Sequence, residues 1–275
     1  MRIEFTKMHG LGNDFAVFEA PAASALDGAL IRRLADRHTG IGFDQALLLE
    51  TPRRSDSAVF YRIFNADGVE VEQCGNGARC IAALLAARGR ARSGAVTMES
   101  PAGLIEARTL PAGLVSVDMG PVRFDPRSLP FDAEAEADRY WLDAGGSRIE
   151  IGAVSIGNPH AVLAVDSAEA ADVERLGPAI ERHPRFPRRV NAGFMQIIDR
   201  ARIRLRVYER GAGETLACGT GACAAVAIGR RWGKLEREVQ VSVRGGELRV
   251  NWNGPGEHIW LTGPTEISFA GYVEV

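Results

Sequence analysis

Two cysteines in this sequence share one local setting, in which the cysteine precedes a glycine-containing turn and a run of small apolar residues. Cys74 begins the segment CGNGARC, and Cys218 begins the segment CGTGACA. The N–H groups and the positive dipole end at the start of a helix stabilise a thiolate over a thiol. We therefore expect both cysteines at helix N-termini, each able to act as a base or nucleophile near neutral pH. The glycines beside them allow close backbone approach to an anion such as a carboxylate.

The two cysteine segments belong to a repeat that runs along most of the chain. Cys218 follows Cys74 by 218 − 74 = 144 positions, and other landmarks keep nearly this offset. Asn158 corresponds to Asn13, His160 to Phe15, Asn191 to Gln45, and Glu209 to Asn65. A repeat of this extent predicts two domains of similar fold, related by a pseudo-twofold axis, with one thiol in each.

The apolar patterns predict an α+β fold. Short strand-like segments separated by Gly and Pro alternate with few helices, and the segments after both cysteines are apolar on nearly every side, as in a helix buried all round. Each domain is therefore expected to wrap a curved, barrel-like sheet of mixed or antiparallel strands around one central apolar helix. The predicted domains are residues 1–120, completed by a strand at 265–275, and residues 121–264. If the two helix starts face each other, both thiols point into one cleft.

Composition narrows the class of function. The chain has 275 residues and a net charge of −2, with no long run of one charge sign, which argues against a nucleic-acid surface. No stretch approaches the roughly 18 apolar residues of a membrane span, and the N-terminal residues do not resemble a signal peptide. A cytoplasmic location is the expectation. The four cysteines are then expected to be reduced thiols and not a disulfide framework.

Two opposed thiols suit the inversion of a carbon stereocentre without a cofactor. A base on one face removes a proton, and an acid on the other face delivers one, so each cysteine ends the turnover in the state in which its partner began. The N–H groups beside the glycines could stabilise the adjacent carboxylate as negative charge grows on it.

The sequence resembles the diaminopimelate epimerases over essentially its full length. The motifs that carry the resemblance are MHGLGNDF, GFDQ, FNADG, EQCGNGARC, GNPH, VNAGF, YERGAGET and ACGTGACA. The resemblance implies a fold like that of the family, no cofactor, no metal, a homodimer, and conversion of LL- to meso-diaminopimelate on the route to lysine and peptidoglycan precursors.

The resemblance also implies roles for individual residues. Cys74 and Cys218 match the catalytic cysteines, with Cys74 the base toward the LL isomer and Cys218 the acid, and with the roles reversed for the meso isomer. His160 and Glu209 match the residues that tune the pKa of the cysteines, and Arg210 matches the residue that grips the distal carboxylate. The residues that match the family's substrate-binding set are Asn13, Gln45, Asn65, Gly75, Asn76, Asn158, Asn191, Glu209, Arg210, Gly219 and Thr220.

Other functions remain as alternatives. A related cofactor-independent racemase, acting on proline or hydroxyproline, is the nearest, although the arginine and the amide side chains imply a second charged end on the substrate. A metal module is disfavoured because Cys80 and Cys223 lie within apolar helices and no C-x2-C spacing occurs. A dithiol redox protein lacks C-x-x-C, a pure binding protein needs no opposed thiols, and a nucleotide-binding protein lacks its glycine motif.

Overall fold

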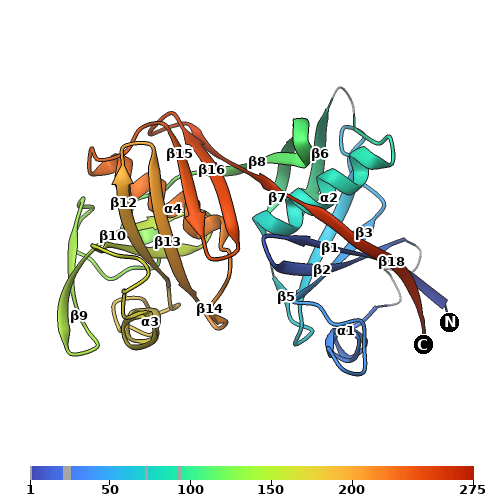
Figure 1. Ribbon diagram of the computed structural model, residues 1–275, viewed down its shortest axis with the longest axis horizontal. Helices are drawn as coiled ribbons and strands as arrows, with labels where there is room; N and C mark the ends of the chain where they lie inside the picture. The colour runs from blue at the N-terminus through green and yellow to red at the C-terminus, as the bar shows by residue number, and fades with distance from the viewer. Residues whose placement is uncertain (1, 21–25, 72–73, 92–93) are drawn as a thin grey trace. The chain divides into compact units, whose positions relative to one another are not determined.

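The chain forms two compact units in a computed structural model that describes residues 2–20, 26–71, 74–91 and 94–275. The first unit holds residues 1–118 together with 262–275, and the second holds residues 119–261 (Figure 1). The predicted boundaries, at 120/121 and 264/265, lie close to these. The strands β8 (Leu114–Pro121) and β17 (His258–Pro264) carry the chain from one unit to the other.

The first unit is built mainly from strands. They are β1 (Arg2–Gly10), β2 (Asn13–Glu19), β3 (Gln45–Glu50), β4 (Val59–Asn65), β5 (Glu70–Val71), β6 (Ala95–Ser100), β7 (Gly103–Thr109) and β18 (Glu266–Glu274). Its helices are α1 (Gly28–Ala35) and α2 (Gly75–Ala87), with a 3-10 turn at Pro111–Gly113. The strands pair in the order β18, β1, β2, β3, β4, β6, β7, β8, in which β2–β3 and β4–β6 are parallel and the other pairs antiparallel.

The second unit repeats this plan. Its strands are β9 (Tyr140–Ala144), β10 (Ser147–Ser155), β11 (Pro159–Ala164), β12 (Asn191–Asp199), β13 (Arg202–Glu209), β14 (Gly213–Glu214), β15 (Glu238–Val243) and β16 (Gly246–Trp252). Its helices are α3 (Val173–Glu181) and α4 (Gly219–Arg231), with a 3-10 turn at Pro126–Ser128. The pairing order is β9, β10, β11, β12, β13, β15, β16, and again the third and fifth pairs, β11–β12 and β13–β15, are parallel.

The register of the two units is equivalent at the strands that carry candidate site residues. Phe15 on β2 pairs with Gln45 on β3, and His160 on β11 pairs with Asn191 on β12. These are the positions that the sequence repeat matched. The predicted α+β class and the internal repeat are therefore confirmed at the level of strand pairing.

Each curved sheet surrounds one central helix, as predicted (Figure 1). α2 packs against β1, β2, β6 and β7, and α4 packs against β10, β11, β12, β13 and β16. Both helices have 13 residues and are buried along nearly their whole length, because small and apolar side chains cover every side of them. The sheet can close tightly around such a helix.

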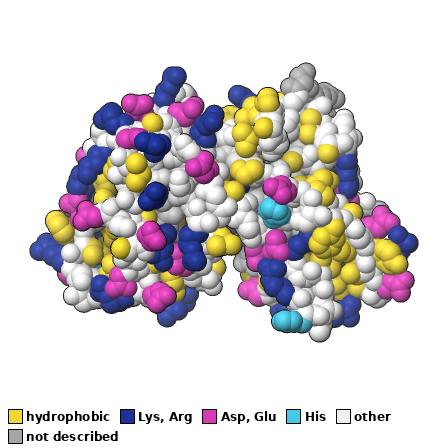
Figure 2. Space-filling model, in the orientation of Figure 1, with side chains coloured by type: hydrophobic (Ala, Val, Ile, Leu, Met, Phe, Trp, Pro, Cys, Tyr) yellow, Lys and Arg dark blue, Asp and Glu magenta, His cyan; other side chains and the backbone are white. Residues whose placement is uncertain are grey.

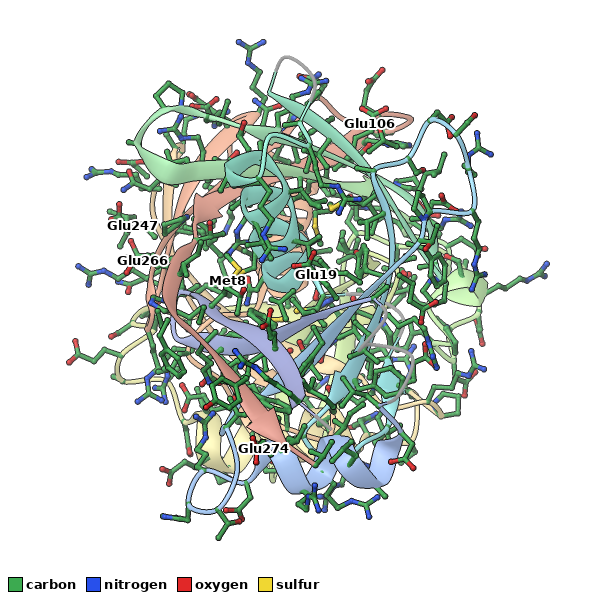
Figure 3. All side chains as sticks on the ribbon, turned by 90° about the vertical axis from the view of Figure 1, so that its right-hand side faces the viewer. Met8, Glu19, Glu106, Glu247, Glu266 and Glu274 are labelled. Atoms are coloured by element: carbon green, nitrogen blue, oxygen red, sulfur yellow. The ribbon has the colours of Figure 1, made fainter. Side chains whose placement is uncertain are left out.

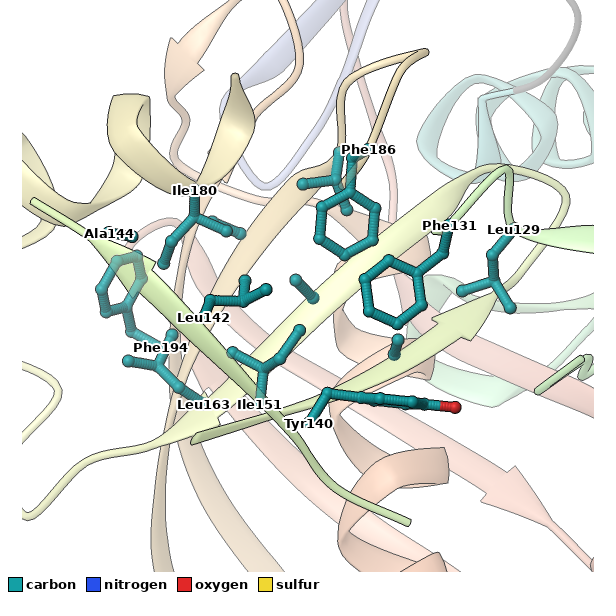
Figure 4. Close-up of a cluster of buried hydrophobic side chains, with 14 of the residues drawn as sticks. Leu129, Phe131, Tyr140, Leu142, Ala144, Ile151, Leu163, Ile180, Phe186 and Phe194 are labelled. Atoms are coloured by element: carbon teal, nitrogen blue, oxygen red, sulfur yellow. The ribbon is translucent and has the colours of Figure 1, made fainter. Parts of the chain in front are cut away.

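The shorter helices lie on the other side of the strands and bury a single apolar face. Ile31, Leu34 and Ala35 of α1 are buried, as their spacing predicted. In the second unit, α3 and the hairpin of β9 and β10 enclose a cluster in which Phe131 and Phe186 stack with ring centroids 4.4 Å apart (Figure 4). These outer clusters hold the strands in place, so the polar ends of the strands have fixed positions.

Candidate active site

Cys74 lies at the start of the central helix of the first unit. It is the N-cap of α2, and its Sγ accepts a hydrogen bond from the N–H of Gly77 at 3.4 Å. Asn13 Oδ1 lies 3.8 Å from the same sulfur. The predicted position of Cys74 at a helix N-terminus is confirmed, and its thiol is half-buried.

Amide side chains gather at one edge of the first sheet, where three neighbouring strands begin or end, and Asn13 reaches the start of α2 from this edge. Asn13 begins β2, Gln45 begins β3 and Asn65 ends β4. Gln45 Nε2 donates to Asn65 Oδ1 at 2.8 Å, and Asn76 Nδ2 donates to Asn13 Oδ1 at 3.1 Å. Gly12, with φ of 86°, makes the turn that delivers Asn13 to this edge. All predicted site residues of the first unit therefore lie on this edge or at the start of α2.

Cys218 occupies the matching position in the second unit. It is the N-cap of α4, and its Sγ accepts a hydrogen bond from the N–H of Gly221 at 3.3 Å. The hydroxyl of Thr220 lies 3.5 Å from the sulfur. The thiol is buried, with 5% of the residue exposed, so its surroundings decide its protonation state.

The helix N-terminus does not by itself decide the protonation state of Cys218, which the sequence left open. Burial raises the pKa of Cys218 well above its usual value, and the neighbouring carboxyl group of Glu209 raises it further. Hydrogen bonds from Thr220 and Gly221 act in the opposite direction but do not reverse the shift. The dipole effect at a helix start is small compared with the cost of burying a charge. Burial and Glu209 therefore favour the thiol form of Cys218 over the thiolate.

Glu209 lies at the end of β13, beside this thiol. Burial raises the pKa of its carboxyl group, while hydrogen bonds with Thr215 and Cys218 lower it in part. The hydroxyl of Thr215 donates to Glu209 Oε1 at 2.5 Å. The carboxyl group and the thiol share a hydrogen bond, and burial raises the pKa of both.

His160 is fully buried and neutral. Burial, together with the positive charge of Arg210, lowers the pKa of His160 from 6.5 to about 3. Its Nε2 lies 2.9 Å from Asn158 Oδ1, and Asn158 Nδ2 donates to the hydroxyl of Thr220 at 3.3 Å. His160 thus orients the amide of Asn158. Its role in tuning a cysteine stays a prediction.

Asn191, the first residue of β12, connects β11 to the residue that follows β13. Its Nδ2 donates to the carbonyl of Pro159 at 3.1 Å, and its Oδ1 accepts the N–H of Arg210 at 2.8 Å. The guanidinium of Arg210 donates to the carbonyl of Arg188 at 3.2 Å, and the residue is exposed. The backbone of Arg210 is therefore fixed while its charged end can reach a ligand.

Four charged residues beside the first edge escaped the sequence analysis, namely Lys7, Asp14, Arg37 and Asp44. Asp14 follows Asn13 and Asp44 precedes Gln45 in the sequence. This adjacency to two candidate site residues is the feature that could have pointed to the two carboxylates. Asp beside Gly or Asn is more often a turn residue, so the motif letters alone did not separate them.

The described part of the chain holds no candidate for a metal site or for a membrane-spanning helix. Over these residues, no group of three or more His, Cys, Asp or Glu side chains could hold a metal ion. Across the same ranges, every helix is too short or too polar to cross a membrane. The four cysteines, which all lie in the described ranges, are not joined by disulfide bonds.

Comparison with known proteins gives a consistent result. The family model described as diaminopimelate epimerase matches residues 5–124 and 152–268. A diaminopimelate epimerase of Nitrosomonas europaea is 54% identical over 276 residues and one of Stutzerimonas stutzeri is 50% identical over 276 residues, each match covering 100% of both proteins.

Solved structures share the fold at low identity. A probable proline racemase from Agrobacterium radiobacter has a TM-score of 0.71 at 20% identity and covers 99% of this chain and 93% of its own. A hydroxyproline epimerase from Agrobacterium vitis has a TM-score of 0.68 at 17% identity and covers 99% of this chain and 92% of its own. Likeness at this level shows a common fold and leaves the substrate open.

Proposed function

Because the chain belongs to the diaminopimelate epimerase family, we propose that Cys74 and Cys218 are the acid and base of its reaction. The enzyme is an isomerase that interconverts LL- and meso-diaminopimelate, a step of lysine biosynthesis. The observation that carries the two-thiol proposal is the matched pair of N-cap cysteines, each starting a buried 13-residue helix in a unit of the same strand order.

The proton moves in two balanced steps. The thiolate of Cys74 takes the proton from Cα of the LL isomer, and the electron pair of the broken C–H bond stays on the carbon and its carboxylate. The thiol of Cys218 then gives its proton to the opposite face of that carbon. Starting from the meso isomer, the two roles reverse. The raised pKa of Cys218 supports its part as the acid, because it keeps the proton on sulfur at neutral pH.

The carboxylate beside the reacting carbon is the group that must be stabilised. We assign it to the starts of α2 and α4, at Gly75 and Asn76 and at Gly219 and Thr220, because N–H groups at helix starts favour an anion. Asn76 and Thr220 are buried, so an interaction there is little screened by water.

The far end of the substrate requires other groups. Arg210 is assigned to the distal carboxylate, since its backbone is held by Asn191 while its guanidinium is exposed. The remaining polar side chains assigned to the substrate are Asn13, Gln45, Asn65, Asn158, Asn191 and Glu209. A substrate with a second charged end makes use of this set, and proline has no such end.

A homodimer is part of the proposal. β18 presents exposed apolar side chains, with Ile267 and Phe269 each 51% exposed and Tyr272 53% exposed. Glu266 and Glu274 mark the two ends of this strand in Figure 3, and hydrophobic side chains gather on the face of the first unit that β18 crosses (Figure 2). An apolar strand of this kind suits a second copy of the chain. Phe269→Glu should then give a monomer in sedimentation.

The cellular setting follows from the chemistry. Two catalytic thiols must stay reduced, which favours the cytoplasm. Added reductant should restore activity to protein that has been oxidised in air.

Proton exchange in D2O tests the proposed reaction. Loss of the Cα–H signal of LL-diaminopimelate, followed by proton NMR, is expected for the wild type and not for Cys74→Ala or Cys218→Ala. Cys80→Ala and Cys223→Ala are matched controls in the same two helices and should exchange normally. Exchange with L-proline and none with diaminopimelate would instead support a racemase, the activity named for one protein of similar fold.

A further inference from the structure

The amide of Asn13 is held at both ends. Its Nδ2 donates to Asp44 Oδ2 at 3.0 Å, and its Oδ1 accepts from Asn76 Nδ2 at 3.1 Å and lies 3.8 Å from Cys74 Sγ. An ionised carboxylate only accepts hydrogen bonds, so Asp44 can face the NH2 end of this amide and not its oxygen. The oxygen of Asn13 must therefore point to Cys74 and Asn76.

Asp44 is itself held by a reciprocal pair of hydrogen bonds with Asp14. The N–H of Asp14 donates to Asp44 Oδ2 at 3.1 Å, and the N–H of Asp44 donates to Asp14 Oδ1 at 2.9 Å. These bonds join the start of β2 to the residue before β3. They explain why Asp44 stays beside Asn13 although its side chain is 43% exposed.

Two cations neutralise the two carboxylates. Arg37 donates to both oxygens of Asp14, at 2.8 and 3.0 Å, and to Asp44 Oδ1 at 2.7 Å. Lys7, with only 8% of its side chain exposed, donates to Asp14 Oδ2 at 2.5 Å and to the carbonyl of Gly42. Burial raises the pKa of Asp14, but Arg37 and Lys7 outweigh burial and hold that pKa well below its usual value. Asp14 therefore acts as an acceptor at neutral pH, and Asp44 accepts hydrogen bonds from Arg37 and from the N–H of Asp14.

The second unit has no such cluster at the corresponding positions. In the register shared by β2–β3 and β11–β12, Pro159 stands for Asp14 and Val190 stands for Asp44. There the amide of Asn158 is oriented by His160 and Thr220 instead. The ionic cluster is therefore not a requirement of this fold, and it occurs only in the unit that contains Cys74.

We propose that Asp44, supported by Asp14, Lys7 and Arg37, is a positioning residue that turns the Asn13 amide so that its oxygen faces the Cys74 thiol. A released amide could present its NH2 group to the sulfur and would then favour a thiolate over a thiol. Asp44 thus keeps the oxygen of Asn13 beside the sulfur, where it can accept a hydrogen bond when Cys74 carries the proton during turnover. The inference rests on the proposed role of Cys74 in epimerisation.

A double-mutant cycle tests whether Asp44 acts through Asn13. Asp44→Ala should lower kcat for LL-diaminopimelate by about tenfold in the wild-type background and by less than about twofold in the Asn13→Ala background. Asp44→Asn keeps an acceptor oxygen and should recover part of the loss. An equal loss in both backgrounds would show that Asp44 supports only the fold and would overturn the proposal.

The matched control is Asp36→Ala. Asp36 lies, like Asp44, between α1 and β3. It accepts hydrogen bonds from the N–H groups of His38 and Thr39 and from the Thr39 hydroxyl, and Asn13 is not among these partners. Asp36→Ala should leave kcat unchanged. The melting temperatures of all the variants show any loss of stability that they share.

A second measurement does not depend on epimerase activity. The rate at which iodoacetamide modifies Cys74, followed by mass spectrometry of its peptide, should rise in Asp44→Ala and stay unchanged in Asp36→Ala. A rate in Asp44→Ala at or below that of the wild type would overturn the positioning role even if the enzyme is an epimerase. A wild type that exchanges no diaminopimelate proton would overturn the proposed function alone, because the alkylation result would still stand.

Discussion

The carboxyl group of Glu209 and the thiol of Cys218 are hydrogen-bonded neighbours in a buried setting that raises the pKa of both. Because the charge of Glu209 raises the pKa of Cys218, it favours the state in which the proton is on the sulfur.

Glu209→Gln should separate the part that Glu209 plays as a proton acceptor from the effect of its charge on the pKa of Cys218. Turnover should fall by about 100-fold, in the range of a lost acid–base group, because the amide cannot take a proton from the thiol. Modification of Cys218 by iodoacetamide should become faster, because the charge that raised its pKa is gone. Glu214→Gln, which breaks the ion pair with Arg206 in the same hairpin, is the control. Unchanged turnover in Glu209→Gln would contradict the pairing.

His160 makes stability depend on pH. Its pKa is 6.5 in an unfolded chain and about 3 in the folded protein, so the folded state binds fewer protons between these values. Its contribution to stability is full above pH 6.5 and is lost as the pH falls toward 3, with a slope of about 1.4 kcal/mol per pH unit.

His160→Phe tests this dependence, since Phe15 stands at the corresponding position of the first unit. The variant should be less stable than the wild type at pH 7, and the difference in unfolding free energy should shrink at pH 5. Urea denaturation at both values measures it. A difference that does not change with pH would mean that His160 has the same pKa in the folded protein as in the unfolded chain.

Gly221 leaves less room than Gly77, its counterpart in the first unit. A Cβ on Gly221 would lie 2.9 Å from Val207 Cγ2 and 3.2 Å from Cys218 Sγ, whereas one on Gly77 would lie 3.1 Å from Leu47 Cδ2 and 3.6 Å from Cys74 Cβ. Gly221→Ala should displace the sulfur and lower turnover by about 100-fold. Gly77→Ala should cost about 1 to 3 kcal/mol of stability but keep more of the turnover. Equal turnover in the two variants would refute the steric argument.

Thr220 gives a test of hydroxyl chemistry at constant size. Its oxygen accepts from Asn158 Nδ2 and contacts the Cys218 thiol. Thr220→Val removes that acceptor at a buried site and should cost about 1 to 3 kcal/mol in stability, with a loss of turnover. Thr220→Ser keeps the hydroxyl and should retain turnover. If the serine variant loses as much as the valine variant, the methyl group is the important part of Thr220.

Features that depend on neighbouring residues were predictable from the sequence. The apolar spacing of Ile31, Leu34 and Ala35 gave the buried face of α1, and the Cys-Gly-x-Gly segments gave the starts of α2 and α4. These patterns are local, because the period of a helix and the chemistry of its cap lie within a few residues.

Features that depend on strand register were not predictable. Asp14 and Asp44 meet only because β2 and β3 pair in parallel, 30 residues apart in sequence. The raised pKa of Cys218 likewise depends on burial and on the end of β13 lying beside the start of α4. A single sequence shows the dipole at a helix start but not the groups that other elements bring to it.

The pairing of β1 with β18 also constrains the order of folding. β1 begins at Arg2 and β18 ends at Glu274, and the whole second unit is synthesised between them. During translation the second unit can form its sheet while the first still lacks an edge strand. Until β18 is synthesised, one side of β1 stays unpaired, and an unpaired strand edge is open to wrong pairing and to chaperones.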